Sequence, residues 1–181
     1  MLFQLHRIGR IRRHLTDDSA KILVHALVLS RLDYCNSLFV GLLKKDIHRL
    51  QVIQNAAARL IFRKKPSDDA TVLLKKLHWL PISQRIDYKL IVLTYRCLHG
   101  QAPPYLSRHI VPYVPGRSLR SDNLGRISVP PKPKLVNYGQ RAFSQTAPRL
   151  WNDLPASIRL APNFSVFKSL LKTHLYATAY L

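Results

Sequence analysis

LQVIQNAAARLIFRKK, residues 50–65, joins an apolar segment with three consecutive alanines to three consecutive cations. At about 100° per residue, one arc of a helix through this stretch collects apolar side chains: Ile47, Leu50, Ile53, Ala57, Leu60 and Ile61. The opposite side is polar or basic: Lys45, His48, Asn55, Arg59 and Arg63. Alanines allow a neighbouring helix to approach closely. We therefore predict a close-packed helix over residues 46–62 with a cationic outer face.

The sequence before this helix predicts two more helices. The Arg-rich segment MLFQLHRIGRIRRHL is interpreted as the first helix of the fold, and a mitochondrial transit peptide is the alternative. Thr16 predicts an N-cap, followed by Asp17 and Asp18 in the first turn, where the helix dipole favours negative charge. This second helix is predicted to end near Asp33, before a connector that Gly41 closes.

Helical patterns continue to residue 100. A serine and two aspartates, residues 67–69, repeat the capping arrangement and predict a short helix through Leu77. After HWLP, a longer helix is predicted over residues 83–99, ended by Gly100. This helix is apolar or aromatic in almost every direction except for one basic stripe: Arg85, Lys89 and Arg96.

The composition of the sequence changes after residue 100, where prolines become frequent. Prolines and arginines predict an extended segment with, at most, short strands at 127–129 and 135–137. Helical pattern returns over 139–151, with an interruption at Pro148. A final amphipathic helix sets apolar residues against two lysines: Phe164, Phe167, Leu171 and Leu175 against Lys168 and Lys172. We predict a mainly α fold: a helical bundle (1–100), a Pro/Arg-rich connector (101–137) and a smaller C-terminal helical cap (138–181).

Net charge is the property that points most directly to a partner. Twenty-nine Lys and Arg stand against nine acids, all of them aspartate, which gives +20. Without glutamate most of these cations have no intramolecular partner, and they repel one another. Nucleic acid is the commonest polyanion that neutralises such an excess, and an anionic membrane surface is the second. The 47% share of hydrophobic residues indicates a folded chain rather than a disordered one.

The sequence shows no catalytic constellation. Asp-Asp pairs at 17–18 and 68–69 resemble metal-binding carboxylates, but each follows Thr or Ser and precedes a helical pattern, so we interpret both as helix N-terminal charge. Cys97 and His99 lack a second cluster that would complete a tetrahedral metal site. Cys35 and Cys97 are expected as reduced thiols of an intracellular protein. We predict no enzyme activity for this chain alone, no cofactor and no small-molecule substrate.

Basic helix faces are the candidate binding sites, because phosphate contacts require only positioned cations. The aromatic residues near them are expected in the core, and stacking on bases is the alternative: Trp79, Tyr88, Tyr95 and Tyr113. The predicted nucleic-acid-binding residues are Arg59, Arg63, Lys64, Lys65, Arg85, Lys89 and Arg96, with Arg117 and Arg120 added from the connector.

Several motifs carry a resemblance to a known family. They are SRLDYCNSLFVGL, LQVIQNAAARLIF, LHWLPISQRIDYKL, LTYRCLHGQAPPYL, YGQRAFSQTAPRLWNDLPASIR and FKSLLKTHL. In this order they resemble the C-terminal region of the reverse transcriptase polyprotein of non-LTR, LINE-type retrotransposons of the jockey-like group. The resemblance implies a thumb up to about Arg63 and then a tail expected to bind nucleic acid. Fingers, palm, endonuclease and zinc knuckle have no counterpart in the sequence, so no catalytic residue is carried over.

The predicted function is thus a non-catalytic fragment of an RNA-directed DNA polymerase that binds RNA and/or DNA. Its basic helix faces would contact the backbone of a template–primer duplex. Two alternatives stay open: a structural RNA-binding subunit of a mitochondrial ribonucleoprotein, or a decayed retroelement fragment without function. The expected location is intracellular, in nucleus or cytoplasm, with mitochondrial import as part of the first alternative. No apolar run reaches the roughly 20 residues that span a bilayer, so we expect no membrane partner.

Overall fold

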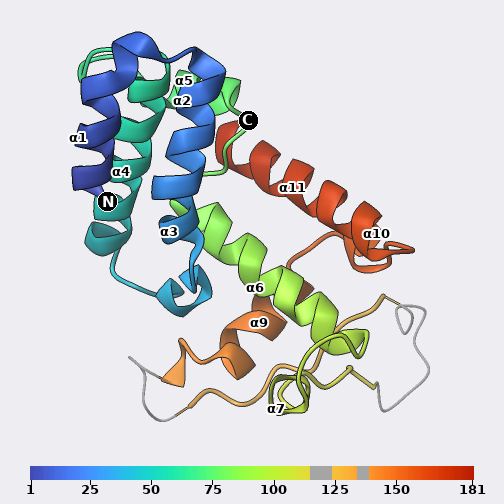
Figure 1. Ribbon diagram of the computed structural model, residues 1–181. Coiled ribbons are helices and arrows are strands. Elements are labelled where there is room, and N and C mark those ends of the chain that lie inside the picture. The colour runs from blue at the N-terminus through green and yellow to red at the C-terminus, as the bar shows by residue number, and fades with distance from the viewer. Residues whose placement is uncertain (115–123, 134–138) are drawn as a thin grey trace. The chain divides into compact units, whose positions relative to one another are not determined.

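The computed structural model describes residues 1–114, 124–133 and 139–181, and these residues are mainly α-helical (Figure 1). The α-helices are α1 (Leu2–Ile11), α2 (Asp17–Val24), α3 (Ser30–Asp33), α4 (Lys44–Ile61), α5 (Ala70–Lys76), α6 (Ile82–Leu98), α7 (Pro104–Ser107), α9 (Phe143–Asn152), α10 (Ala156–Arg159) and α11 (Phe164–Tyr180). The predicted mainly α class is confirmed. The expected strand at 127–129 is reduced to one antiparallel bridge between Pro112 and Ile127, and the one at 135–137 lies outside the described residues.

The chain divides into two compact units. Unit 1 comprises Met1–Ile86 together with Thr178–Leu181, and unit 2 comprises Asp87–Ala177. Helices α6 and α11 therefore contribute residues to both units. The segments 1–100, 101–137 and 138–181 divide the sequence by composition, and they stay a prediction.

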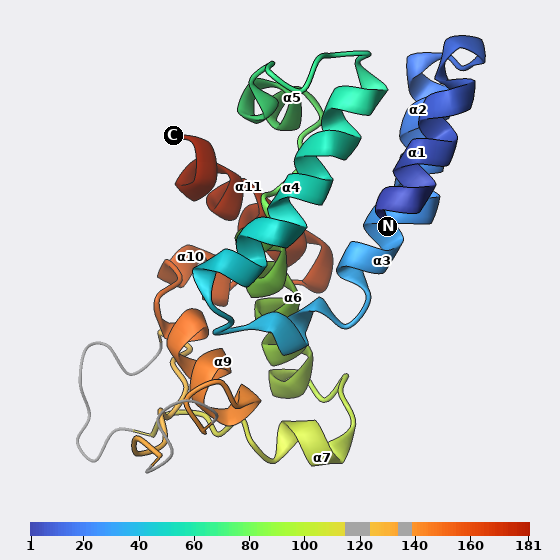
Figure 2. The ribbon, with the colours of Figure 1, turned by 90° about the vertical axis from the view of Figure 1, so that its left-hand side faces the viewer.

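Helix α4 is the centre of unit 1, and its alanines explain how closely it packs. Ala57 and Ala58 are both 0% exposed, and α1 and α2 lie against this helix (Figures 1 and 2). A Cβ added to Gly9 of α1 would lie 3.8 Å from Leu60 Cδ1, so α1 also approaches α4 closely. The predicted close packing of α4 through small residues is confirmed.

The buried face of α4 differs in detail from the predicted arc. Gln54 is 0% exposed, whereas Ile47, Leu50 and Ile53 are only half-buried. The Gln54 amide donates to the Leu80 carbonyl at 2.9 Å, and it accepts from Gln51 Nε2 at the same distance. A buried amide is tolerated because its polar atoms have partners. At about 100° per residue Gln54 lies within the predicted arc, and the prediction omitted it because its side chain is polar.

The helix predicted to run to Asp33 is present, with a local irregularity. The Thr16 hydroxyl accepts the Ser19 N–H at 3.1 Å, which confirms the N-cap. Residues 25–29 form a π-helical turn between α2 and α3, and α3 ends at Asp33. A π-turn accommodates one extra residue without ending the helix. Val28 and Leu29, both within this turn, are fully buried.

The caps of α5 and α6 show one correction and one confirmation. The N-cap of α5 is Asp69, whose carboxylate accepts the Thr71 N–H at 2.8 Å, and not Ser67 as predicted. Helix α6 ends at Leu98, and Gly100 follows with φ of 67°, a conformation that glycine adopts without steric cost. The Gln101 N–H then closes the helix end on the Arg96 carbonyl at 2.8 Å.

Unit 2 is built around aromatic residues of α6, α9 and α11. Tyr95, Trp151 and Phe167 are at most 3% exposed, and their rings contact one another with centroid distances of 4.2 to 6.5 Å. The apolar face predicted for the last helix is confirmed, since Phe167, Leu171 and Leu175 are buried. The interruption expected at Pro148 is wrong: α9 passes through this proline, which is fully buried. Packing compensates for the single backbone hydrogen bond that proline removes.

Candidate nucleic-acid interface

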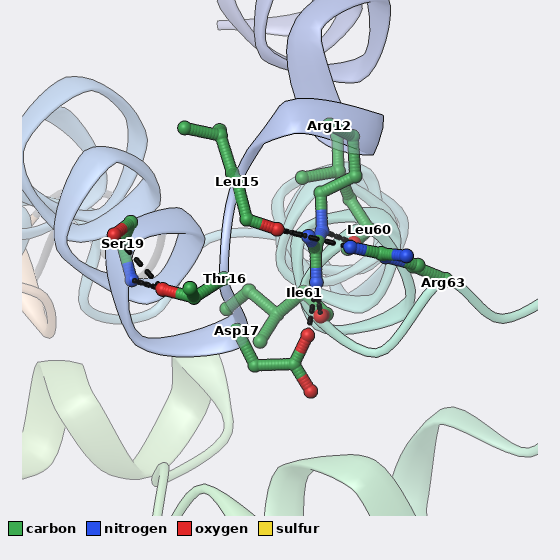
Figure 3. A network of polar contacts seen from close by, with 8 residues as sticks. All are labelled: Arg12, Leu15, Thr16, Asp17, Ser19, Leu60, Ile61 and Arg63. Carbon is green, nitrogen blue, oxygen red and sulfur yellow. Dashed lines mark hydrogen bonds and ion pairs between the residues drawn. The ribbon is translucent and has the colours of Figure 1, made fainter.

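A buried arginine closes the C-terminal end of α4 (Figure 3). Arg12 is 6% exposed and donates from Nε to the Leu60 carbonyl at 3.0 Å and from Nη2 to the Ile61 carbonyl at 2.6 Å. Its Nη1 donates to the Leu15 carbonyl at 2.6 Å, and Asp17 completes the set through an ion pair. The last carbonyls of a helix lack intrahelical donors and carry partial negative charge, so a guanidinium satisfies them and stabilises the helix dipole.

Two predicted phosphate ligands on or near α4 have internal partners. Arg59 is half-buried, and its Nε donates to the Asp68 carbonyl at 2.9 Å. Arg63 is exposed, and its Nη2 donates to the Leu15 carbonyl at 3.0 Å (Figure 3). Arg63 also has φ of 52°, because it follows the C-cap of α4 at the position where glycine is usual. Both arginines therefore fasten the end of α4.

Lys64 and Lys65 are exposed but lie beside acids. The connection that contains them joins α4 to α5, and the Lys65 N–H donates to Asp68 Oδ2 at 2.8 Å. Arg63 links this connection to the segment that contains Asp17 and Asp18. Four aspartates, at 17–18 and 68–69, therefore accompany the cations at this end of unit 1. These acids offset only part of the positive charge of Arg12, Arg13, Arg59, Arg63, Lys64 and Lys65, so this end keeps a net positive charge and stays a predicted phosphate site.

Arg85 forms an internal ion pair with Asp33 and is mostly shielded from solvent. Its Nε donates to Asp33 Oδ1 at 2.8 Å, and its Nη2 pairs with the second carboxylate oxygen. The arginine side chain is 17% exposed. A bidentate pair of this kind fixes the start of α6 on the end of α3 within unit 1. Arg85 of the predicted basic stripe on α6 therefore has an internal partner, and its role as a phosphate ligand stays a prediction.

Lys89 and Arg96 are exposed, as predicted, and unit 2 adds two lysines to them. The Asp87–Leu98 part of α6 and the Phe164–Ala177 part of α11 run in opposite directions (Figure 1). Lys168 and Lys172 are exposed on α11. No ion pair to a carboxylate is seen for any of the four within the described ranges. We call this set the α6–α11 basic surface: Lys89, Arg96, Lys168 and Lys172.

Phe164 brings the two helices' charges together. The Arg96 guanidinium lies 5.1 Å and the Lys168 ammonium 4.7 Å from the Phe164 ring centroid, so these charges are at most about 10 Å apart. Both are cation–π contacts that hold long side chains over a half-buried ring. The α6–α11 basic surface is thus partly preorganised, with its charges still open to solvent.

The remaining predicted residues have separate outcomes. Arg117 and Arg120 lie outside the described residues. Trp79 and Tyr95 are 6% and 3% exposed, which confirms their expected place in the core, and Tyr88 is half-buried. Tyr113 is 52% exposed and is available at the surface.

A second buried arginine, not anticipated from the sequence, performs in unit 2 the task of Arg12 in unit 1. Arg159 is 7% exposed and donates to the carbonyls of Leu124 at 2.9 Å and of Asn152, the last residue of α9, also at 2.9 Å. Burial, and then the positive charge of Arg126, lower the pKa of Arg159. No local pattern separates it from a surface arginine.

Other site types find little support in the part of the chain that the structure describes. No cluster of three or more His, Cys, Asp or Glu suited to a metal ion occurs there, and none of its helices has the length and apolar character needed to cross a bilayer. Burial raises the pKa of the Cys97 thiol, which makes it a poor nucleophile. Unit 1 contains an open hollow of about 600 Å³ between α4 and Pro81, lined in part by His48, Gln51 and Tyr180.

Comparison with known proteins gives no match to any family model, curated protein sequence or solved structure.

Proposed function

We propose that this protein is a non-catalytic nucleic-acid-binding module that engages the phosphate backbone of a duplex through the α6–α11 basic surface. The observation that carries the proposal is the presence of four exposed cations on two antiparallel helices without carboxylate partners among the described residues. Such cations lose little by exchanging water and counterions for phosphate. The contacts would be independent of base sequence.

The use of the acids inside the fold supports this proposal. Several aspartates accept internal hydrogen bonds or ion pairs: Asp17, Asp33, Asp46, Asp68 and Asp69. They fix helix ends and are not free to neutralise distant lysines and arginines. The net charge of +20 already counts these aspartates, so this excess of positive charge favours an external polyanion.

The spacing of the four charges suits a phosphate backbone. Lys89 and Arg96 are two helical turns apart, roughly 10 Å, and Lys168 and Lys172 are about 6 Å apart. A nucleic-acid strand presents a phosphate every 3.4 Å or so along the duplex axis. The surface therefore spans about three phosphates of one strand.

The resemblance of the sequence motifs to LINE-type reverse transcriptases gives this module a proposed context. In that context, it would hold a template–primer duplex for a polymerase whose catalytic residues lie elsewhere. Only the motifs indicate this context, whereas the net charge of +20 favours a polyanionic partner whatever the origin of the chain.

The test is fluorescence anisotropy of the full chain with labelled RNA–DNA hybrid, duplex DNA and single-stranded RNA, each over a salt series. The variant K89Q/R96Q/K168Q/K172Q removes the α6–α11 basic surface. The control K21Q/R31Q/K44Q/K45Q removes the same charge from exposed positions of unit 1. We expect the first variant to lower the slope of log K against log[salt] by about 2 to 4 units, since each phosphate contact contributes about 0.9.

The control variant is expected to change this slope by less than about one unit. Equal losses in both variants would show a diffuse charge effect and would overturn the assignment of the site. Absence of binding by the folded wild-type chain would overturn the proposed function itself.

A further inference from the structure

Three stacked rings lead from the core of unit 2 to its surface. The Tyr95 and His99 rings are 3.8 Å apart between centroids with an interplanar angle of 15°, and Tyr95 and Phe167 are 4.2 Å apart at 28°. Two rings at such distances cannot share one face of Tyr95, so Tyr95 lies between them. Phe167 is fully buried and His99 is exposed. The outer face of His99 is therefore the solvent end of the stack.

The His99 ring is held in a fixed orientation. Its Nδ1 donates to the Tyr95 carbonyl at 2.8 Å, one turn back along the same helix end. A ring fixed by a hydrogen bond and by stacking loses little conformational entropy when a ligand covers it. This is the condition that distinguishes a preorganised stacking surface from a mobile surface histidine.

The space around Gly100, the residue after His99, is open and lies near the proposed phosphate contacts. A Cβ on the next residue, Gly100, would have no heavy atom within 4 Å apart from those of its chain neighbours. Arg96 is one turn before His99 on α6, and it shares the Phe164 ring with Lys168. A strand whose phosphates contact these two cations would have its bases within reach of His99.

The helix end itself does not oppose an anionic ligand strongly. The Tyr95 carbonyl accepts the His99 N–H at 3.1 Å and Nδ1 at 2.8 Å, and the Arg96 carbonyl accepts the Gln101 N–H at 2.8 Å. These terminal carbonyls are thus occupied by protein donors. The partial negative charge of the helix end is reduced by them and by the guanidinium of Arg96.

We propose that His99 is a stacking platform for an unpaired nucleobase, so that the module recognises a duplex with a single-stranded extension in preference to a blunt duplex. This inference rests on the proposed function, because the α6–α11 basic surface supplies the phosphate contacts. Stacking accepts any base, since every base has a π-face. The ligand class is therefore a junction between duplex and single strand, without preference for the identity of the base.

The experiment compares three short RNA–DNA hybrids by anisotropy: blunt, with one unpaired 3′ nucleotide, and with one abasic 3′ nucleotide of equal charge. We expect the wild-type chain to bind the unpaired base about fivefold more tightly than the abasic extension, the lower end of the contribution of a base–aromatic stack. H99A should remove this ratio and H99F should retain it. H109A, at another exposed histidine of unit 2, is the matched control.

The three variants should bind the blunt hybrid with affinities within about twofold of wild type, which separates stacking from phosphate contact. The inference is overturned if wild type binds the hybrid with an unpaired base and the hybrid with an abasic extension equally tightly. It is also overturned if H99A keeps the wild-type preference for the unpaired base. In either case intact binding of the blunt hybrid would leave the proposed function standing. Loss of all binding by the folded wild-type chain would overturn both.

Discussion

Replacement of Arg12 by alanine tests whether a buried arginine holds unit 1 together. The variant R12A leaves the Ile61 carbonyl, which is buried, without the 2.6 Å hydrogen bond that Arg12 Nη2 provides. The Leu60 carbonyl retains a backbone donor, the Arg63 N–H at 3.3 Å, and Leu15 retains the Arg63 side chain at 3.0 Å. The main loss therefore falls on one buried carbonyl and on the helix dipole.

These contacts convert into an expected free energy of unfolding. A hydrogen bond from a charged donor to a buried acceptor contributes about 1.5 to 3 kcal/mol. The interaction of the cation with the helix end adds about 0.5 to 1 kcal/mol. The ion pair with Asp17, which is 61% exposed, adds less than about 1 kcal/mol. We expect R12A to destabilise unit 1 by about 3 kcal/mol, and R12K to recover about a third of the loss.

The chain offers a separate reporter for each unit. It contains two tryptophans, Trp79 in unit 1 and Trp151 in unit 2. In a W151F background, urea unfolding followed by tryptophan fluorescence reports unit 1. With a slope of about 2 kcal/mol per molar urea, R12A should lower the midpoint by about 1.5 M. R10A, at an exposed position of α1, is the control and should shift it by less than about 0.3 M. A midpoint for R12A equal to that of R10A would refute the role assigned to Arg12.

Three other perturbations have defined outcomes. Burial raises the pKa of Asp87 to about 6, so the folded state holds this proton more tightly than the unfolded state does. Protonated Asp87 therefore stabilises the folded state below about pH 4, and this stabilisation is lost as pH rises through the folded pKa of about 6. In pH-dependent urea unfolding, D87N should lack this decline and gain up to about 3 kcal/mol at pH 7, reduced by partial solvent exposure. G125A should destabilise unit 2 by about 2 kcal/mol, because Gly125 has φ of 60° and a Cβ there would lie 3.3 Å from Leu160 Cδ2. Gly100 also has a positive φ but no close neighbour, so G100A should destabilise unit 2 by only about 1 kcal/mol. Equal losses of unfolding free energy for G125A and G100A, followed by Trp151 fluorescence, would contradict the proposed clash with Leu160. R85Q should destabilise unit 1 by about 1 kcal/mol, because it removes the ion pair with Asp33. The slope of log K against log[salt] for nucleic-acid binding should stay unchanged. A reduced slope would show that Arg85 contacts phosphate.

Sequence patterns predicted those parts of the fold that depend on neighbouring residues. The Thr16 cap, the amphipathic pattern of α11 and the glycine after α6 are local features, and each was found where expected. Helices α4 and α5 end in the same left-handed conformation at Arg63 and His78. Both ends lie within one residue of the predicted ends at 62 and 77, but the left-handed conformation itself was not predicted, because neither position holds a glycine.

The candidate site was less predictable because the role of an arginine depends on distant partners. Arg12 and Arg85 differ little from surface arginines in their local sequence, yet their partners are 48 and 52 residues away. Conversely, Lys168 was identified only as part of a polar face, since its relation to Arg96 depends on the packing of α6 against α11. Periodicity assigns a side chain to a face and cannot identify the group opposite it.

The choice of hydrogen-bond acceptors by the two buried arginines has a practical consequence for work with this protein. Arg12 and Arg159 bind mostly backbone carbonyls, which are neutral and shielded from solvent. Dissolved ions screen such contacts far less than they screen charges at the surface. Concentrated salt should therefore leave both units folded, and under the proposed function it would release bound nucleic acid during purification without a denaturation and refolding step.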